Sequence, residues 1–173
     1  MMAYLGWLAV ALAPLPIQDA PDPDERPDIA LLLAPGDPET LLLDLGNFWK
    51  ASGRTDFPAI LAMEPGPLVL KQGLKLLPNQ VPPRLSLPRL LLISNLGDLA
   101  VPVQLLAFVR RCLVEGTAVW VIGRDFPAGL GELPLDSGQT IQLVSPDVLF
   151  DKLTAFFSTP LEGEPAAEPQ PPR

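Results

Sequence analysis

The amino-acid sequence predicts a three-layer α/β domain with a mainly parallel sheet of about five strands. Two stretches, residues 29–63 and 90–122, carry this prediction, because in each a short apolar run is followed by a helix-like pattern and then by a second apolar run. Each stretch is therefore expected to form a β-strand, a crossover helix and a parallel β-strand. Helices cover both faces of parallel sheets, which gives the three layers.

The first stretch begins with an apolar run of strand length at 29–33 and ends with another at 59–63. Between them, Asp37-Pro38-Glu39 is typical of a helix start, with an aspartate at the N-cap, a proline at the first helical position and an acid in the first turn. Gly53 is expected to end this helix. One apolar stripe of the helix should face the core, formed by Leu41, Leu42, Leu45, Phe48 and Trp49.

The second stretch predicts a buried strand at 90–93, a turn at 94–98 and a helix that starts near Pro102 and ends at Gly116. The apolar run at 118–122 is its second buried strand. This stretch is the strongest structural signal in the chain, because strand, turn, helix and strand follow one another without interruption.

Beyond it we expect a glycine- and proline-rich loop at 123–139, a strand at 140–144 and a last helix that starts at Ser145-Pro146-Asp147. Ser145 is interpreted as the N-cap of that helix. The whole arrangement is expected to be Rossmann-like or flavodoxin-like, with a hairpin and loop insertion. Such folds carry many unrelated functions, so the fold does not identify the activity.

Residues 64–88 form the insertion that interrupts the alternation of strands and helices. Two apolar segments flank Gln72-Gly73, and this pattern predicts a β-hairpin over 68–77. The proline-containing stretch up to Pro88 is expected to be an extended surface connection. We expect the insertion to cover a sheet edge. The alternative is an arm that binds a partner.

The two ends of the chain differ in composition from residues 28–158, which are expected to form the α/β domain. Residues 1–27 combine an apolar run with a linker rich in proline and aspartate, and residues 159–173 are expected to be a disordered, acidic, proline-rich tail. The formal net charge of −8 comes mostly from these ends, since 29–158 holds twelve acids and ten bases. The apolar run is shorter than the ~20 residues that span a bilayer, and no basic residues precede it as they precede a signal peptide's apolar core.

The residue content excludes several kinds of chemistry. Histidine is absent, which excludes His-based acid–base catalysis, Ser-His-Asp and Cys-His nucleophiles and histidine metal sites. The single cysteine, Cys112, falls on the apolar side of the second helix and is expected to be buried and unreactive. Ser94 and Ser145 end strands, but a serine nucleophile without histidine needs a nearby lysine, and no lysine is placed there. The near-neutral domain without a basic cluster argues against nucleic-acid binding.

Candidate binding residues lie where the predicted strands run into loops, at the edge of the sheet where open α/β folds bind ligands. Asp37, Asp98 and Asp147 each follow a strand. Their carboxylates could hold Mg²⁺, but helix capping is the favoured interpretation, and no metal or cofactor is predicted. Arg124 and Asp125 follow the strand at the end of the second stretch, and the arginine suits a phosphate or carboxylate. The binding candidates are therefore Asp98, Arg124, Asp125 and Asp37.

These observations favour a non-catalytic interaction or assembly subunit, because the expected core holds few titratable groups. Three segments are available to contact a protein partner or a membrane surface: the N-terminal apolar run, the hairpin 68–77 and the tail 159–173. A first alternative is a small-molecule- or nucleotide-binding protein, or a Mg²⁺-dependent enzyme, that uses the carboxyl edge of the sheet. A second alternative is a membrane-tethered or exported domain. The cytoplasm is the expected compartment.

Overall fold

The computed structural model describes residues 27–54, 58–64, 66–78, 87–94, 101–136 and 138–158. Its main feature is a sheet of five parallel strands in the order β2-β1-β5-β6-β7. The apolar runs of the sequence form these strands, and the predicted fold class is confirmed. The strands are β1 (Ile29–Leu33), β2 (Ala59–Ala62), β5 (Leu90–Ile93), β6 (Ala118–Ile122) and β7 (Ile141–Val144).

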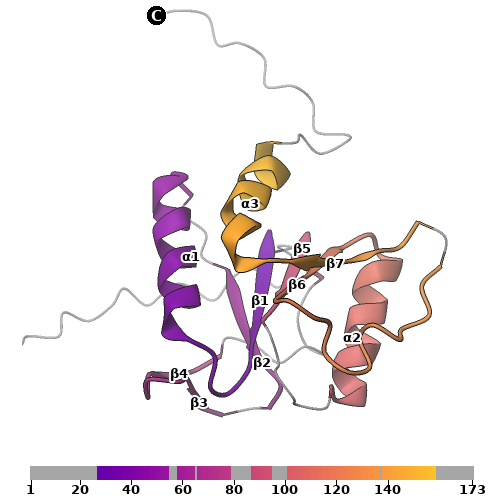
Figure 1. The fold of residues 1–173 in the computed structure, drawn as a ribbon, viewed down its shortest axis with the longest axis horizontal. Helices are drawn as coiled ribbons and strands as arrows, with labels where there is room; N and C mark the ends of the chain where they lie inside the picture. Colours follow the sequence, from indigo (N-terminus) through magenta and orange to yellow (C-terminus); the bar gives the residue numbers. More distant parts are fainter. Residues whose placement is uncertain are drawn as a thin grey trace, which may run out of the picture.

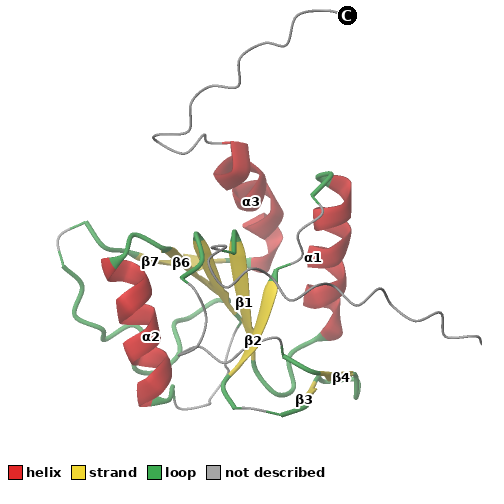
Figure 2. Cartoon of the chain, turned by 180° about the vertical axis from the view of Figure 1, so that it is seen from behind, coloured by secondary structure: helices red, strands yellow, loops and turns green. Residues whose placement is uncertain are grey.

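Among the described residues, three α-helices cover this sheet: α1 (Glu39–Ala51), α2 (Val103–Val114) and α3 (Leu149–Ser158). Helices α1 and α3 lie on one face and α2 on the other (Figures 1 and 2). Side chains alternate along β1 accordingly, because successive residues of a strand point to opposite faces. Leu31 belongs to the core beneath α1 and α3, and Leu32 belongs to the core beneath α2.

The order in which successive strands are added to the sheet reverses at β1. It first passes from β1 to its neighbour β2 and then crosses to β5 on the other side of β1. Counted within this sheet alone, the order is 2-1-3-4-5, the flavodoxin-like one of the two predicted arrangements. The carboxyl ends of β1 and β5 therefore flank the topological switch point, where open α/β sheets bind ligands.

The last described helix completes the core on the α1 side of the sheet. Phe157 of α3 packs edge-on against Trp49 of α1 with 5.5 Å between ring centroids, and Phe156 packs against Trp120 of β6 at 5.6 Å. Both tryptophans are buried. Cys112 is fully buried on the opposite face, as the sequence predicts.

The predicted hairpin is present, formed by β3 (Leu68–Val69) and β4 (Lys75–Leu76) as a separate two-stranded antiparallel sheet. It does not pair with an edge strand of the main sheet. Instead, Gly36 donates a backbone hydrogen bond to Val69, and Lys71 donates one to the carbonyl of Asp37. The hairpin, which forms most of the described part of the insertion, therefore lies against the turn between β1 and α1, at the carboxyl end of the sheet. Most of the rest of the insertion, on which the expected edge cover also depends, lies outside the described residues.

Several predicted features lie outside the described residues. These are the apolar run and linker up to residue 26, the tail from residue 159, most of the connection that leads to Pro88, and residues 95–98 of the predicted turn, which include Asp98. In the part of the chain that the structure describes, no helix combines the length and apolar character needed to cross a membrane.

Candidate functional site

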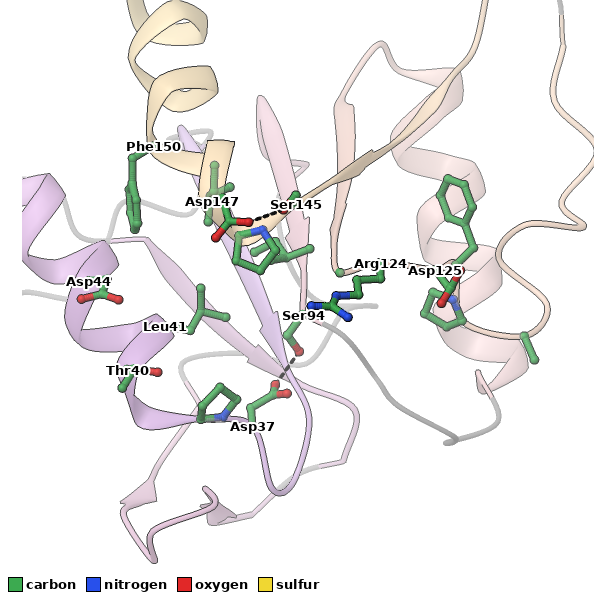
Figure 3. A pocket seen from close by; sticks show the side chains of 18 residues that line it. Asp37, Thr40, Leu41, Asp44, Ser94, Arg124, Asp125, Ser145, Asp147 and Phe150 are labelled. Carbon is green, nitrogen blue, oxygen red and sulfur yellow. Dashed lines mark hydrogen bonds between the residues drawn. The ribbon is translucent and has the colours of Figure 1, made fainter.

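A pocket of about 850 Å³ opens at the carboxyl ends of β1, β5, β6 and β7, beside the switch point (Figure 3). This volume lies within the range of small-molecule sites. The pocket is lined by polar side chains and by an apolar surface. The polar ones are Asp37, Thr40, Asp44, Ser94, Arg124, Asp125, Ser145 and Asp147, and the apolar surface includes Leu41, Ile122, Phe126, Leu149 and Phe150.

Asp37 does not cap α1, in contrast to the sequence prediction. The N-cap position is Pro38, and no side chain caps the helix there. The Asp37 carboxylate instead accepts two hydrogen bonds at Oδ2, from the Ala34 backbone N–H at 2.6 Å and from the Ser94 hydroxyl. Because Ala34 follows β1 and Ser94 follows β5, this carboxylate joins the two strand ends across the switch point.

The environment of Asp37 also changes its acidity. Burial raises the pKa of its carboxyl above the ordinary value of 3.8, and the hydrogen bonds from Ser94 and Ala34 offset part of that rise. Asp37 is only 6% exposed, yet it lines the pocket. Its second oxygen, Oδ1, accepts no hydrogen bond from any residue in the described ranges.

Arg124 and Asp125 follow β6 and line the same pocket. Figure 3 shows the Arg124 side chain extending toward Ser94, whereas the Asp125 side chain lies on the other side of it. Among the described residues neither side chain forms an ion pair or a hydrogen bond. These two neighbours therefore do not form an ion pair with each other.

Ser145 and Asp147 complete the polar lining on the β7 side. They lie at a short 3₁₀ turn, Pro146–Val148, that leads into α3. Ser145 occupies the N-cap position of this turn, but its hydroxyl donates to Asp147 Oδ2 at 3.3 Å and caps no backbone N–H. The predicted capping hydrogen bond is absent here.

The first turns of α1 supply lining residues that the sequence analysis did not single out. Thr40 and Asp44 face the pocket together with Leu41. Thr40 and Asp44 are four positions apart within α1, a spacing that places two residues on the same side of a helix. That spacing was the signal available in the sequence.

Three observations concern nucleophilic and metal chemistry near the pocket. Ser94 is 1% exposed and its hydroxyl already donates to Asp37, so a substrate cannot approach it as it would approach a nucleophile. Lys152, the lysine closest in sequence to Ser145, bonds to Gln142 at 3.3 Å. Within the described ranges, no group of three or more carboxylate or cysteine side chains is placed to hold a metal ion.

No protein-family model matches the sequence, and no curated protein matches it. Among solved structures, the chain is similar to a proposed transcriptional regulator protein from Vibrio parahaemolyticus, with 14% identity and a TM-score of 0.48 over 57% of this chain and 56% of that one. It is also similar to a cysteine-to-alanine mutant of a DJ-1 superfamily protein from Salmonella typhimurium, with 20% identity and a TM-score of 0.44 over 55% and 54%. The chain thus spans little more than half of each, and neither likeness bears on function.

Proposed function

We propose that this chain is a small-molecule-binding α/β domain that holds its ligand at the carboxyl edge of the sheet. The observation that carries the proposal is the pocket of about 850 Å³ beside the β1–β5 switch point. Its polar groups converge from four strand ends and from α1, and an apolar surface surrounds them. A few placed polar groups in a largely apolar concavity are typical of ligand sites.

Binding without catalysis fits the residues of this pocket. The chain contains no histidine, and Ser94 is buried beneath its hydrogen bond to Asp37. Among the described lining residues there is no lysine to serve as a base or nucleophile. Asp37 and Arg124 are therefore assigned to ligand recognition, with Asp125 in a supporting position.

A thermal-shift screen of the full chain tests this function. The panel contains nucleotides, sugar phosphates, amino acids and dipeptides, polyols and divalent cations. A ligand at ~100 times its dissociation constant adds roughly 2.7 kcal/mol to native stability, which a melting curve resolves. We expect at least one class to raise the melting temperature.

Two variants of α1 show whether such a shift arises in the pocket. Thr40→Trp places a large side chain in the lining, whereas Leu43→Trp adds the same group where the native side chain is 61% exposed. The shift should disappear in Thr40→Trp and persist in Leu43→Trp. A silent panel, or a shift that survives in Thr40→Trp, would refute the proposed function.

A second candidate function, the interaction or assembly subunit, is supported by the surface of the hairpin. Val69, Leu74 and Leu77 are 45%, 43% and 79% exposed, although all three are large apolar residues. Exposed apolar groups gathered on one segment are typical of protein contact sites. We propose a protein with an apolar groove as the partner; contacts through the N-terminal run or the tail remain predictions.

Crosslinking in cells that make the chain tests this second function. Leu77→Ser removes the most exposed apolar group of the hairpin, and Val103→Ser removes one of 77% exposure on α2. A specific crosslinked partner should be lost from Leu77→Ser and kept by Val103→Ser. Equal crosslinking of both variants would show that the hairpin is not the contact.

A further inference from the structure

From the charges and hydrogen bonds of this pocket, and resting on the proposed function, we infer that the ligand is a small zwitterion. It carries an ammonium group, a carboxylate and an apolar body of about dipeptide size. The ammonium contacts Asp37, and the carboxylate contacts Arg124. Four observations lead to this class, beginning with the turn between β1 and α1.

This turn, residues 34–38, has no backbone N–H to offer a phosphate. Ala34 donates to the Asp37 carboxylate at 2.6 Å, Gly36 donates to Val69 at 3.0 Å, and Asp37 donates to the Ala34 carbonyl at 3.2 Å. The other two residues of the turn are prolines, which lack an N–H. A phosphate bound at a turn of this kind depends on free N–H groups, so the turn at 34–38 does not suit a nucleotide phosphate.

The charges of the lining are mainly negative. Asp37, Asp44, Asp125 and Asp147 contribute four carboxyl groups, whereas Arg124 is the single cation among the described lining residues. Opposite charge attracts and like charge repels most strongly where water is excluded, which applies to buried Asp37 more than to the exposed Asp44, Asp125 and Asp147. A ligand with a cationic group is therefore favoured over a phosphorylated one, whose negative charge the carboxylates would repel.

Asp37 is the acid best placed to hold that cationic group. It is more than nine-tenths buried, its Oδ2 is occupied by two protein donors, and its Oδ1 has no partner among the described residues. An ammonium group has three donors and suits such an acceptor at the floor of a pocket. The bonds at Oδ2 hold the carboxylate in place before the ligand arrives.

Arg124 is the residue placed to bind the carboxylate of the ligand. Its guanidinium is free of ion pairs with the described residues and extends into the pocket from the end of β6 (Figure 3). A guanidinium binds a carboxylate through two parallel hydrogen bonds. Leu41, Leu149 and Phe150 supply an apolar surface for the body of the ligand. The volume of about 850 Å³ accommodates a molecule larger than one amino acid.

Calorimetric titration of the full chain with leucyl-leucine tests the inference. Two blocked forms serve as matched probes: the N-acetyl form lacks the ammonium, and the C-terminal amide lacks the carboxylate. We expect leucyl-leucine to bind and each blocked form to bind about tenfold or more weakly, since each lacks a charge-assisted contact. Adenosine monophosphate is the phosphate probe and should not bind.

Charge-removing variants assign each end of the probe to its residue. Asp37→Asn should weaken the binding of leucyl-leucine but leave the already weak binding of the N-acetyl form unchanged. Arg124→Gln should likewise weaken the binding of leucyl-leucine but leave the already weak binding of the C-terminal amide unchanged. Asp151→Asn on α3 and Arg110→Gln on α2 make the same charge changes at exposed positions outside the pocket and should leave binding unchanged. Circular dichroism verifies that each variant is folded.

The outcomes separate this inference from the function on which it rests. If adenosine monophosphate binds, leucyl-leucine does not, and Thr40→Trp abolishes that binding, the pocket is a ligand site but the zwitterion is wrong. Equal binding of leucyl-leucine and its blocked forms also overturns the zwitterion. If no compound in the wider panel binds through the pocket, both the function and the inference fail.

Discussion

The hydroxyl of Ser94 donates a hydrogen bond to Oδ2 of Asp37, although 57 positions separate these residues in the chain. Asp37 lies beyond the end of β1, and Ser94 immediately follows β5. The bond therefore joins the two strands at the point where the order of the sheet reverses. It fixes a buried carboxylate at the pocket, so the same hydrogen bond sets the geometry of the site and contributes to the stability of the fold.

Removing this carboxylate should destabilise the protein. Asp37→Ala leaves the N–H of Ala34 and the hydroxyl of Ser94 buried without an acceptor, and each unsatisfied donor costs about 1–3 kcal/mol. We expect a loss of about 2 kcal/mol or more in urea unfolding. Asp37→Asn keeps an acceptor oxygen, so its free energy of unfolding should decrease less than that of Asp37→Ala. Asp44→Ala, at an exposed position of the same pocket, is the control; equal losses in the three variants would contradict this assignment.

The raised pKa of Asp37 predicts how stability depends on pH. The folded state holds the Asp37 proton more tightly than the unfolded state, whose carboxyl has an ordinary pKa of 3.8. Between these two pKa values the folded protein binds more protons, so raising the pH lowers the free energy of unfolding. The difference between the urea midpoints of the wild type and of Asp37→Asn should therefore fall as the pH rises from 3.8 through the folded-state pKa. A rising difference would show that the pKa is lowered.

Glu39 should hold the hairpin in place. Its side chain is 6% exposed, and Oε1 accepts hydrogen bonds from the backbone N–H groups of Gln72 at 2.6 Å and Leu74 at 3.4 Å. Glu39→Ala removes this acceptor and should cost about 1–2 kcal/mol. Amide hydrogen exchange at Gln72 and Leu74 should quicken in Glu39→Ala and change much less in Glu39→Gln, which keeps an oxygen. Unchanged exchange in Glu39→Ala would mean that other contacts hold the turn.

Cys112 should react with thiol reagents only when the protein unfolds. It is fully buried within α2 and is the single cysteine of the chain, so any labelling reports on this one site. Thiolate reactivity requires exposure to solvent. We expect labelling by a disulfide reagent to be slow in buffer and fast in concentrated urea. Rapid labelling of the folded protein would show that the helix opens locally.

The elements of the fold could be predicted because their signals are local. The buried strands at 29–33, 90–93 and 118–122 are short apolar runs, and the crossover helices show the three- and four-residue spacing of an amphipathic helix. The order of the strands is not local information, since it depends on which side of β1 the chain crosses to reach β5. The sequence was compatible with two orders, and only the structure distinguishes them.

The site could be predicted in part for the same reason. Asp37, Arg124 and Asp125 were expected at the carboxyl edge because they follow strands, and all three line the pocket. Asp98 lies outside the described residues. The role of Asp37 as a bridge to Ser94 was missed, because Asp37-Pro38-Glu39 matches a local capping pattern and nothing local indicates a partner on another strand.

Glu39 lies in the first turn of α1 as predicted, but its second role, as acceptor for the hairpin, was missed for a similar reason. An acid in the first turn of a helix has a sufficient local explanation in the helix dipole. Its partners, the N–H groups of Gln72 and Leu74, are 33 and 35 positions away. A carboxylate that serves both the helix start and a distant hairpin looks, in the sequence, the same as one that serves only the helix.

The ring contacts of α3 determine when this protein can finish folding during its synthesis. Trp49 is translated about a hundred residues before Phe157, the ring that covers it. Until α3 has left the ribosome, the nascent chain therefore leaves part of this apolar face uncovered, even after β1, α1 and β5 have emerged. The face can close only after residues 149–158 have left the ribosome and can pack against Trp49 and Trp120.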